Sequence, residues 1–425
     1  LLLFKIMNSK KSPCPYGEKC YRINPEHLEQ YDHPKRTKTN DRNSTKILTD
    51  KKTKNPLITN YFKRTKPNES GELDDEQKKI IVNDHLKSPK TLCISKKSLY
   101  HDLIRNLHQK LFLTPIPDEI FLFWNFCQQI SSKQPEDAFI DALGIKLVGP
   151  FDLLNNKLNE SHVGNENILT HWRYFYDPPE FQTFAIIDTN CRNNHLKLES
   201  ISCDYHLGYF RDDPTDQKPL VVSNDSKKSC EIHAEGDNIF ATFHTLLSDK
   251  RFKLKNNNDQ YNNLRRKLET FAEENQINLI DKTKHEERKK KVNAPTLHQF
   301  GIVVPMSDNN VGYRKLPITD NNLKRSFERI INLNDDEQRR KCSSVKEIQH
   351  MITLIQYAND EKDFGMGLEF GIDLFDAGHQ FFHRSSKHLL KQAYELLDRK
   401  NFAQIIHIHL SDDNRQKQWP NLSAI

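Results

Sequence analysis

The sequence predicts an α+β protein with a mixed N-terminal lobe and a mainly helical C-terminal lobe, preceded by a small module and a disordered linker. Three observations lead to this prediction. Two cysteines and two histidines lie close together in residues 14–33, a polar and basic stretch follows them, and apolar periodicity then runs from about residue 93 nearly to the end of the 425 residues. The first part of that stretch mixes helical patterns with strand-like runs, and helical patterns dominate afterwards.

The candidate metal ligands of the small module are Cys14, Cys20, His27 and His33, in the pattern C-x5-C-x6-H-x5-H. Two thiolates and two imidazoles form a tetrahedral site for Zn²⁺, and in so short a segment the metal supplies most of the folding free energy. A finger that reads the major groove of DNA has about two to four residues between its cysteines and about twelve before its first histidine. The spacing here differs on both counts, so we predict a structural zinc finger without sequence-specific DNA binding.

The residues around these ligands point to a different ligand class. The segment 11–33 reads K-x-x-C-x-Y-G-x-x-C-x-R-x-x-x-x-H-x-x-x-Y-x-H and resembles the poly(ADP-ribose)-binding zinc finger. The resemblance implies that Tyr16, Tyr21 and Arg22 bind the polymer, since aromatic rings stack on adenine and a guanidinium pairs with pyrophosphate oxygens. Alternatively, Tyr16 and Tyr31 form the small core of the finger, and for Tyr31 we favour that role.

The first 90 residues carry the excess of positive charge. They contain 20 Lys and Arg against 12 Asp and Glu, whereas residues 91–425 contain 44 against 46. Residues 1–6 precede Met7 and are not expected to contribute to the fold. The stretch 35–92 has few large apolar residues and should stay disordered. A basic, flexible arm is typical of chromatin-associated proteins, although a solvated tail has the same composition.

One apolar island interrupts this linker. Residues 55–62 read N-P-L-I-T-N-Y-F between lysines and an arginine, and they resemble a peptide that binds the sliding clamp. Ile58, Tyr61 and Phe62 would be its anchors, but Asn55 stands where that family usually has Gln. The alternative is an apolar turn in the linker without a partner, because short motifs also match by chance.

The remaining chain is predicted to form the folded body. We expect a tail at 1–13, the finger at 14–34, the linker at 35–92, an α+β lobe at 93–245 and a helical lobe at 246–425. Strands are predicted at 145–148, 184–187, 205–210 and 220–222, and helices at 99–111, 120–126, 240–247, 261–275, 322–331, 345–360 and 381–410. The aromatic run 171–180 is interpreted as a packed strand and a rigid turn, and the charge run 282–291 as a solvated loop or helix face.

Composition restricts the compartment and the class of protein. Mean hydropathy is −0.80, and no stretch is long and apolar enough to span a membrane, so no membrane partner is expected. The six cysteines outside the finger are scattered without the spacing of a disulfide framework, which is typical of a reducing compartment such as the nucleus or cytoplasm.

Two adjacent acids, Asp360 and Glu361, end the predicted helix 345–360. The carboxyl end of a helix is its negative pole, so carboxylates there are disfavoured unless something else holds them. Such conflicts are expected at functional sites, and a carboxylate in such surroundings can serve as a general base. The alternative is an ordinary acidic helix end.

Two further motif matches in this region are interpreted as coincidental. Asp363-Phe-Gly365 has the sequence of a kinase metal motif, but the other kinase motifs are missing, and Gly365-Met-Gly367 lacks the context of a dinucleotide loop.

Several separate blocks of residues resemble the histone PARylation factor family over roughly residues 100–415. They read YFYDPPEFQT, PTLHQFGIVVP, VGYRKLP, YANDE and DFGMGLE, at 174–183, 295–305, 311–317, 357–361 and 363–369. The resemblance implies an accessory factor that is not an enzyme on its own. Such a factor docks on a DNA-break-activated poly(ADP-ribose) polymerase, which binds NAD⁺, and directs ADP-ribosylation to serine on histones and other proteins.

By this resemblance Glu361 is the base that takes the proton of the acceptor serine. Asp360, Tyr313, Arg314 and Arg384 fall where the family docks on the polymerase. Asn310 and Lys362 depart from the family pattern, which concerns details of docking. We therefore expect a nuclear protein that acts on chromatin at DNA breaks. The alternative is a non-catalytic DNA-repair adaptor that binds poly(ADP-ribose) through the finger and the sliding clamp through residues 55–62.

Overall fold

The computed structural model describes residues 12–13, 31–32, 89–188, 201–252, 258–280, 282–411 and 415. The chain forms two compact units, Leu1–Lys78 and Lys79–Ile425, which are described separately. In the first unit β1 (Ser12–Pro13) pairs in parallel with β2 (Tyr31–Asp32). The predicted zinc ligands and polymer-binding residues of the finger lie outside the described residues, as do residues 35–88 of the linker and the candidate clamp peptide. Residues 89–92, which were expected in the linker, are wrongly assigned there, because helix α3 begins at Pro89.

A five-stranded antiparallel sheet forms the centre of the mixed lobe, and its strands neighbour one another in chain order. Most residues of the three central strands are buried, as expected for a sheet covered on both faces. The four predicted strands are confirmed, whereas the exposed edge strand β7 was not predicted because it contains a single large apolar residue. The strands are β3 (Ile145–Leu147), β4 (Phe181–Ile187), β5 (Tyr205–Phe210), β6 (Leu220–Asp225) and β7 (Ile232–Gly236).

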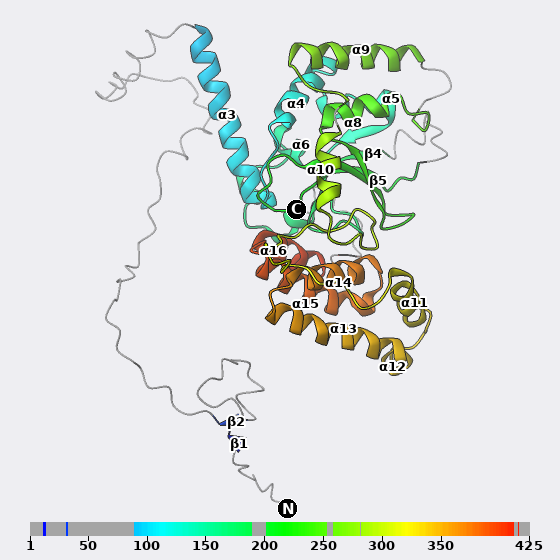
Figure 1. The fold of residues 1–425 in the computed structure, drawn as a ribbon. Coiled ribbons are helices and arrows are strands. Elements are labelled where there is room, and N and C mark those ends of the chain that lie inside the picture. The colour runs from blue at the N-terminus through cyan, green and yellow to red at the C-terminus, as the bar shows by residue number, and fades with distance from the viewer. Residues whose placement is uncertain are drawn as a thin grey trace, which may run out of the picture. The chain divides into compact units, whose positions relative to one another are not determined.

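Helices cover one face of this sheet and form the first hydrophobic core with it (Figure 1). The predicted aromatic helix is confirmed as core, with the Phe123 ring 4.9 Å from that of Phe243. Residues 258–274, which follow the expected lobe boundary at 245, pack in this same core. The α-helices are α3 (Pro89–Phe112), α4 (Glu119–Ile130), α5 (Ile140–Leu143), α6 (Pro150–Leu154), α8 (Ile239–Leu246) and α9 (Asn258–Glu274), and the short 3-10 helices are η2 (Pro135–Asp137), η3 (Glu160–His162) and η4 (Glu166–Thr170).

The predicted strand in the aromatic run 171–180 is wrong, because this segment forms consecutive turns. Buried Asp177 organises them by accepting hydrogen bonds from the amide of Tyr174 and the hydroxyl of Thr183. A ring stack between Tyr174 and His206, with centroids 3.9 Å apart, fixes the turn against β5. Local side-chain bonding therefore replaces the strand pairing that the aromatic pattern suggested.

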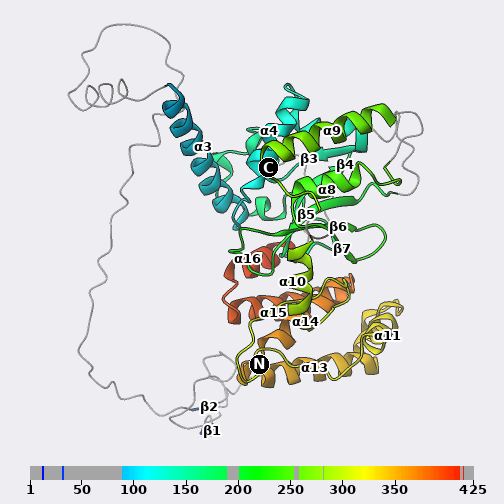
Figure 2. The ribbon, with the colours of Figure 1, turned by 45° about the horizontal axis from the view of Figure 1, so that its top comes forward.

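The helical lobe is built around α14, in which every residue from Gly365 to Asp376 is buried. Figure 1 and Figure 2 show α13 and α15 beside it, with α16 and α11 at the ends of this layer. Helix α14 was not predicted because three glycines weaken its helical signal, although burial on all sides stabilises it. The helices are α10 (Thr283–Lys291), α11 (Asp320–Ile331), α12 (Asp336–Lys341), α13 (Ser343–Asp360), α14 (Phe364–Asp376), α15 (Gln380–Leu396) and α16 (Lys400–His409).

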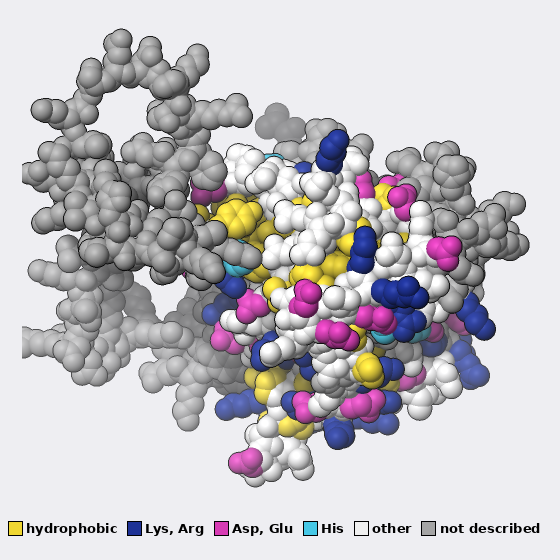
Figure 3. Space-filling view, turned by 90° about the horizontal axis from the view of Figure 1, so that it is seen from above, with side chains coloured by type: hydrophobic (Ala, Val, Ile, Leu, Met, Phe, Trp, Pro, Cys, Tyr) yellow, Lys and Arg dark blue, Asp and Glu magenta, His cyan; other side chains and the backbone are white. Residues whose placement is uncertain are grey.

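The charge run 282–291 forms α10, which buries no residue and is held by polar contacts instead. Arg288 binds Asp212 with two hydrogen bonds of 2.8 Å and stacks over the ring of Phe300. On the face of the body seen in Figure 3, basic and acidic side chains are interspersed. Within the described residues no helix is long and apolar enough to cross a membrane.

Candidate functional site

The joint between α13 and α14 positions Glu361. Helix α13 ends in a Schellman motif, in which the Asp363 amide donates to the Ala358 carbonyl and the Lys362 amide to the Asn359 carbonyl. Lys362 adopts the left-handed conformation that this motif requires, with φ 68°. The backbone at Glu361 is therefore fixed, while 60% of its side chain is exposed.

A loop from the preceding segment completes the site. Gly312 donates its amide to Asp363 Oδ1 at 3.0 Å and accepts the Gly365 amide at 2.8 Å, so the loop is bound to the first turn of α14. This attachment carries Arg314 to the joint, where the guanidinium contacts Glu361 Oε2 and lies 2.9 Å from Asp363 Oδ2. The structure thus brings together two predicted site residues that are 47 positions apart in the sequence.

Tyr313 attaches the same loop to α14 through a second contact. Its hydroxyl donates a 3.0 Å hydrogen bond to Glu369 Oε2 in α14. Burial raises the pKa of Glu369 to about 7. Burial, together with the neighbouring Glu369 carboxylate, also raises the pKa of Tyr313 above its ordinary value. The half-buried ring packs against the second core, so Tyr313 acts in part as a fixing point for Arg314.

The remaining predicted docking residues lie on different elements. Asp360 is the last residue of α13 and is exposed beside Glu361. Arg384 is exposed on α15, and no contact joins it to Glu361 or Arg314 within the described residues. The α13–α14 joint and the 312–314 loop therefore bring Asp360, Glu361 and Arg314 together, whereas Arg384 lies on α15 without a contact to them among the described residues.

Two residues that organise the site were missed by the sequence reasoning, Asp363 and Glu369. Asp363 is 7% exposed and holds both the Gly312 amide and Arg314. Glu369 is 6% exposed and receives the Tyr313 hydroxyl. The available signal was the presence of acids in an otherwise apolar stretch, because a buried carboxylate must find partners within the protein.

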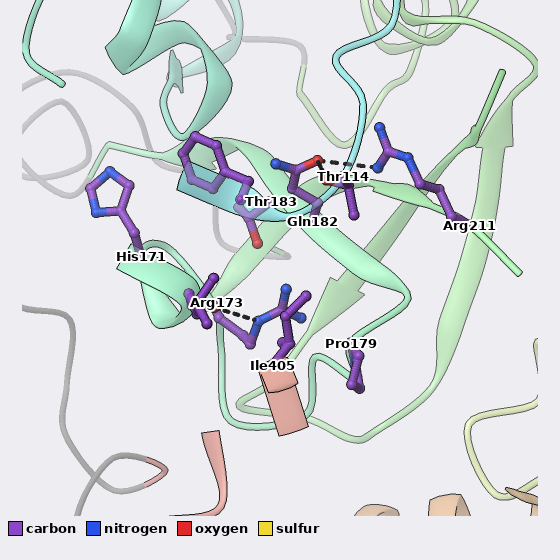
Figure 4. A pocket seen from close by; sticks show the side chains of 10 residues that line it. Thr114, His171, Arg173, Pro179, Gln182, Thr183, Arg211 and Ile405 are labelled. Atoms are coloured by element: carbon purple, nitrogen blue, oxygen red, sulfur yellow. Dashed lines mark hydrogen bonds between the residues drawn. The ribbon is translucent and has the colours of Figure 1, made fainter. Parts of the chain in front are cut away.

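A small cavity lies elsewhere, between the sheet and α16 (Figure 4). Its volume is about 10 Å³, enough for a single water molecule. The Arg211 guanidinium at its wall donates to Gln182 Oε1 at 3.1 Å, and Arg173 donates to the carbonyls of Pro178 and Phe181. These buried groups satisfy one another, so the cavity belongs to the packing of the two lobes.

The candidate metal site lies in the finger. Among the residues that the structure describes, no group of His, Cys, Asp or Glu could hold a metal ion. The pairing of β1 with β2 joins the residues that directly precede Cys14 and His33 in the sequence. With their two thiols and two imidazoles, Cys14, Cys20, His27 and His33 are a donor set that fits Zn²⁺.

Comparison with known proteins covers both units of the chain. The family model for histone PARylation factor 1 matches residues 104–413, and the model for the PBZ domain matches residues 11–36. Histone PARylation factor 1 of Mus musculus is 39% identical over 321 residues, which cover 74% of this chain and 88% of the mouse protein. The Danio rerio protein of the same name is 40% identical over 346 residues, covering 81% of this chain and 95% of that protein.

A human protein named putative histone PARylation factor 1-like is 39% identical over 309 residues, covering 71% of this chain and 84% of its own length. The resemblance predicted from the separate sequence blocks is therefore confirmed over most of the body and over the finger. The chain belongs to the histone PARylation factor 1 family and carries a PBZ domain at its N-terminus.

Proposed function

We propose that this protein is an accessory factor in histone poly(ADP-ribosyl)ation that supplies a general base to a partner polymerase. The chain docks on a DNA-break-activated poly(ADP-ribose) polymerase through Asp360, Tyr313, Arg314 and Arg384. It places Glu361 in the active site where the polymerase holds NAD⁺, and so directs transfer to serine. The family membership supports the broad role, and the geometry at the α13–α14 joint supports the assignment of the base.

The observation that carries the proposal is an exposed carboxylate on a fixed backbone. Glu361 is held by the Schellman motif at the end of α13, and its side chain projects to the surface. Arg314 contacts one carboxylate oxygen, Oε2, while Oε1 has no hydrogen-bond partner among the described residues. A base that must act in another protein's active site needs this combination of exposure and defined direction.

The reaction step requires little else from this chain. A serine hydroxyl is a weak nucleophile until a base takes its proton. As the serine oxygen forms its bond to the ribose carbon of NAD⁺, the bond from that carbon to nicotinamide breaks, and the serine proton passes to Glu361. The nicotinamide leaves with the electron pair of the broken bond. The role of Glu361 is to hold a carboxylate oxygen near the hydroxyl while the bond forms.

Docking on the polymerase would change the contacts of Glu361 through Arg314. In the free chain its guanidinium is shared by Glu361 and Asp363. On docking, Arg314 would exchange Glu361 for an acidic group of the polymerase, which leaves Glu361 Oε2 open to the serine hydroxyl.

The decisive experiment mixes the full chain with activated polymerase, NAD⁺ and histone, and maps the modified residues by mass spectrometry. Glu361→Ala should abolish serine modification, whereas Glu328→Gln, at an exposed position on α11, should leave it unchanged. Serine modification that persists in Glu361→Ala would remove this residue from the chemistry. A non-catalytic adaptor would leave the acceptor residue the same whether or not the chain is added.

We further propose that the finger binds poly(ADP-ribose) through Tyr16, Tyr21 and Arg22 while Zn²⁺ holds its fold. The PBZ match supports this role. Binding of the polymer would retain the protein in the nucleus on chromatin that carries DNA breaks. Binding of the sliding clamp through Ile58, Tyr61 and Phe62 stays a separate proposal that rests on the sequence of residues 55–62.

A further inference from the structure

Three exposed apolar side chains stand on the two segments that form the Glu361 site. Tyr357 in the last turns of α13 is 59% exposed, and Met306 and Val311 in the loop before Gly312 are 42% and 36% exposed. Single exposed apolar residues are ordinary on protein surfaces. Here they stand on two different elements that hydrogen bonds of Gly312 to Asp363 and Gly365 join next to Glu361, and aromatic and Met side chains are typical of contact surfaces.

Tyr357 is the side chain whose position is most informative. Its carbonyl accepts the amide of Glu361, so the two residues are one helical turn apart on the same face of α13. Side chains at this spacing have Cβ atoms about 5–6 Å apart. Within the described part of the chain the Tyr357 side chain has no hydrogen bond and no ring contact. An aromatic ring beside the base is therefore left open to a partner.

The loop that carries Met306 and Val311 is held in place and cannot simply fold over the ring. Its hairpin is closed by a 2.8 Å hydrogen bond from the Ser307 amide to the Val311 carbonyl. Gly312, with φ 140°, packs so closely on Pro305 that an added Cβ would lie 2.2 Å from the Pro305 carbonyl oxygen. The apolar side chains are thus presented on two rigid elements, so the surface is preformed.

The charge of this surface and the distance between Tyr357 and Glu361 indicate which kind of partner binds there. In residues 305–315 and 357–363 acids outnumber bases by four to three: Asp308, Asp360, Glu361 and Asp363 against Arg314, Lys315 and Lys362. A basic polypeptide therefore fits this surface better than an acidic one. An extended chain advances about 3.3 Å per residue, so a serine that reaches Glu361 has its neighbours one or two positions away at the distance of the Tyr357 ring.

We infer that Tyr357, with Met306 and Val311, forms a docking surface for the acceptor, an extended basic segment that presents its serine to Glu361. This inference rests on the proposed function and adds to it the part of this chain that holds the substrate. Tyr357 is a positioning residue: its ring packs on the acceptor next to the serine, and it takes no part in proton transfer.

The test measures serine transfer by the full chain and polymerase to a single-serine basic peptide at varied peptide concentration. Tyr357→Ala should raise the KM for the peptide about tenfold, the usual scale for loss of an aromatic contact. The dissociation constant between chain and polymerase, measured by calorimetry, should not change. Tyr357→Phe should restore the KM, because the ring is kept. Tyr100→Ala, which removes an exposed tyrosine on α3, should change neither quantity.

Two results would overturn the inference while Glu361→Ala still abolishes transfer. An unchanged KM in Tyr357→Ala would show that the ring does not touch the acceptor. A weaker affinity for the polymerase with an unchanged KM would assign the surface to the polymerase instead. Serine transfer that survives in Glu361→Ala would overturn the proposed function itself, and the inference with it.

Discussion

At the scale of single residues, the site depends on a buried acid that takes no part in the proposed chemistry. Asp363 joins the end of α13, the start of α14 and the 312–314 loop, because its two oxygens receive the Gly312 amide and the Arg314 guanidinium. Arg314 is 44% exposed at its side chain, so its ion pair is screened by water and contributes little. The hydrogen bond from the buried Gly312 amide is the stronger term, since removal of its acceptor leaves a buried donor unsatisfied.

Asp363→Ala should therefore lower the free energy of unfolding by about 1–3 kcal/mol, the usual cost of leaving a buried polar group without a partner. Urea denaturation of the body measures this loss. Asp360→Ala, at an exposed position three residues earlier, is the matched control and should stay within about 0.5 kcal/mol of the parent. Equal effects of the two variants would contradict the assigned role of Asp363.

The raised pKa of Glu369 leads to a prediction of how the stability of the folded protein depends on pH. Burial raises its pKa from 4.5 to about 7 in the folded protein, so the folded state holds a proton there that the unfolded chain releases. Stability is then fully present below pH 4.5 and is lost as the pH rises toward about 7. Glu369→Gln keeps an acceptor for the Tyr313 hydroxyl but removes this ionisation.

The difference in unfolding free energy between Glu369→Gln and the parent should accordingly grow in favour of the variant from pH 4.5 to about 7, by an amount on the order of 1–3 kcal/mol. Above that range it should stay constant. Chemical denaturation at a series of pH values gives this difference directly, and buried histidines affect both proteins alike. A difference that does not vary with pH would show that Glu369 is not protonated in the folded state.

At the scale of elements, the contact between the 305–314 loop and α14 is set by glycines. Gly312 has φ 140° and lies against the Pro305 backbone, and a Cβ on Gly365 would lie 3.0 Å from the Gly312 carbonyl oxygen. Gly365 thus permits a close backbone path between the loop and α14. The missing side chain of Gly365 lets the loop approach the helix closely enough to hydrogen-bond, and that of Gly312 lets the loop turn back on Pro305.

Gly312→Ala should therefore displace the loop that carries Tyr313 and Arg314. We expect a loss of about 1–3 kcal/mol in unfolding free energy, together with reduced serine transfer. Gly164→Ala is a matched control, because Gly164 also has a positive φ, 89°, but has no atoms within 4 Å of the added Cβ. Similar losses in the two variants would mean that backbone strain alone, and not the contact with Pro305, determines the effect.

The helices and strands also show how much of the fold could be predicted from the sequence alone. Strong periodicity located α4, α8, α13 and the central strands, because their apolar residues match one face or a fully buried layer. Helix α14 was not predicted, because a helix buried on all sides lacks the one-sided apolar periodicity on which such a prediction depends. The end of α13 at Asp360 was predicted, yet the contact of Arg314 with Glu361 was not, since no local pattern encodes a contact across 47 residues.

At the scale of the whole molecule, the proposed function assigns different tasks to the two units. The body, matched by the family model at residues 104–413, contains the complete site around Glu361, while the PBZ match covers only residues 11–36. The residues of that site are fixed by contacts within the body, such as those of Asp363 and Gly312. The chemistry should therefore be independent of the finger, whose task would be to hold the chain on the product of the partner enzyme.

Two substitutions separate binding of the polymer from folding of the finger. Arg22→Ala should weaken poly(ADP-ribose) binding and keep the zinc content, since the guanidinium is a ligand-facing group in the proposal. His27→Ala should lose both, because a finger of this size folds only with its metal. Metal analysis and a polymer-binding assay give the two quantities. Unchanged polymer affinity in Arg22→Ala would remove that residue from the binding surface.

Deletion of residues 1–34 tests the division of tasks itself. Retention on poly(ADP-ribose)-modified chromatin should fall, because the polymer-binding module is gone, while serine transfer in dilute solution should keep the rate of the full chain. The product of the polymerase would then recruit the factor that selects the acceptor, and each round of modification would favour the next. If transfer in solution also disappears on deletion, the finger takes part in the catalytic assembly, and the contacts around Glu361 do not suffice for the reaction.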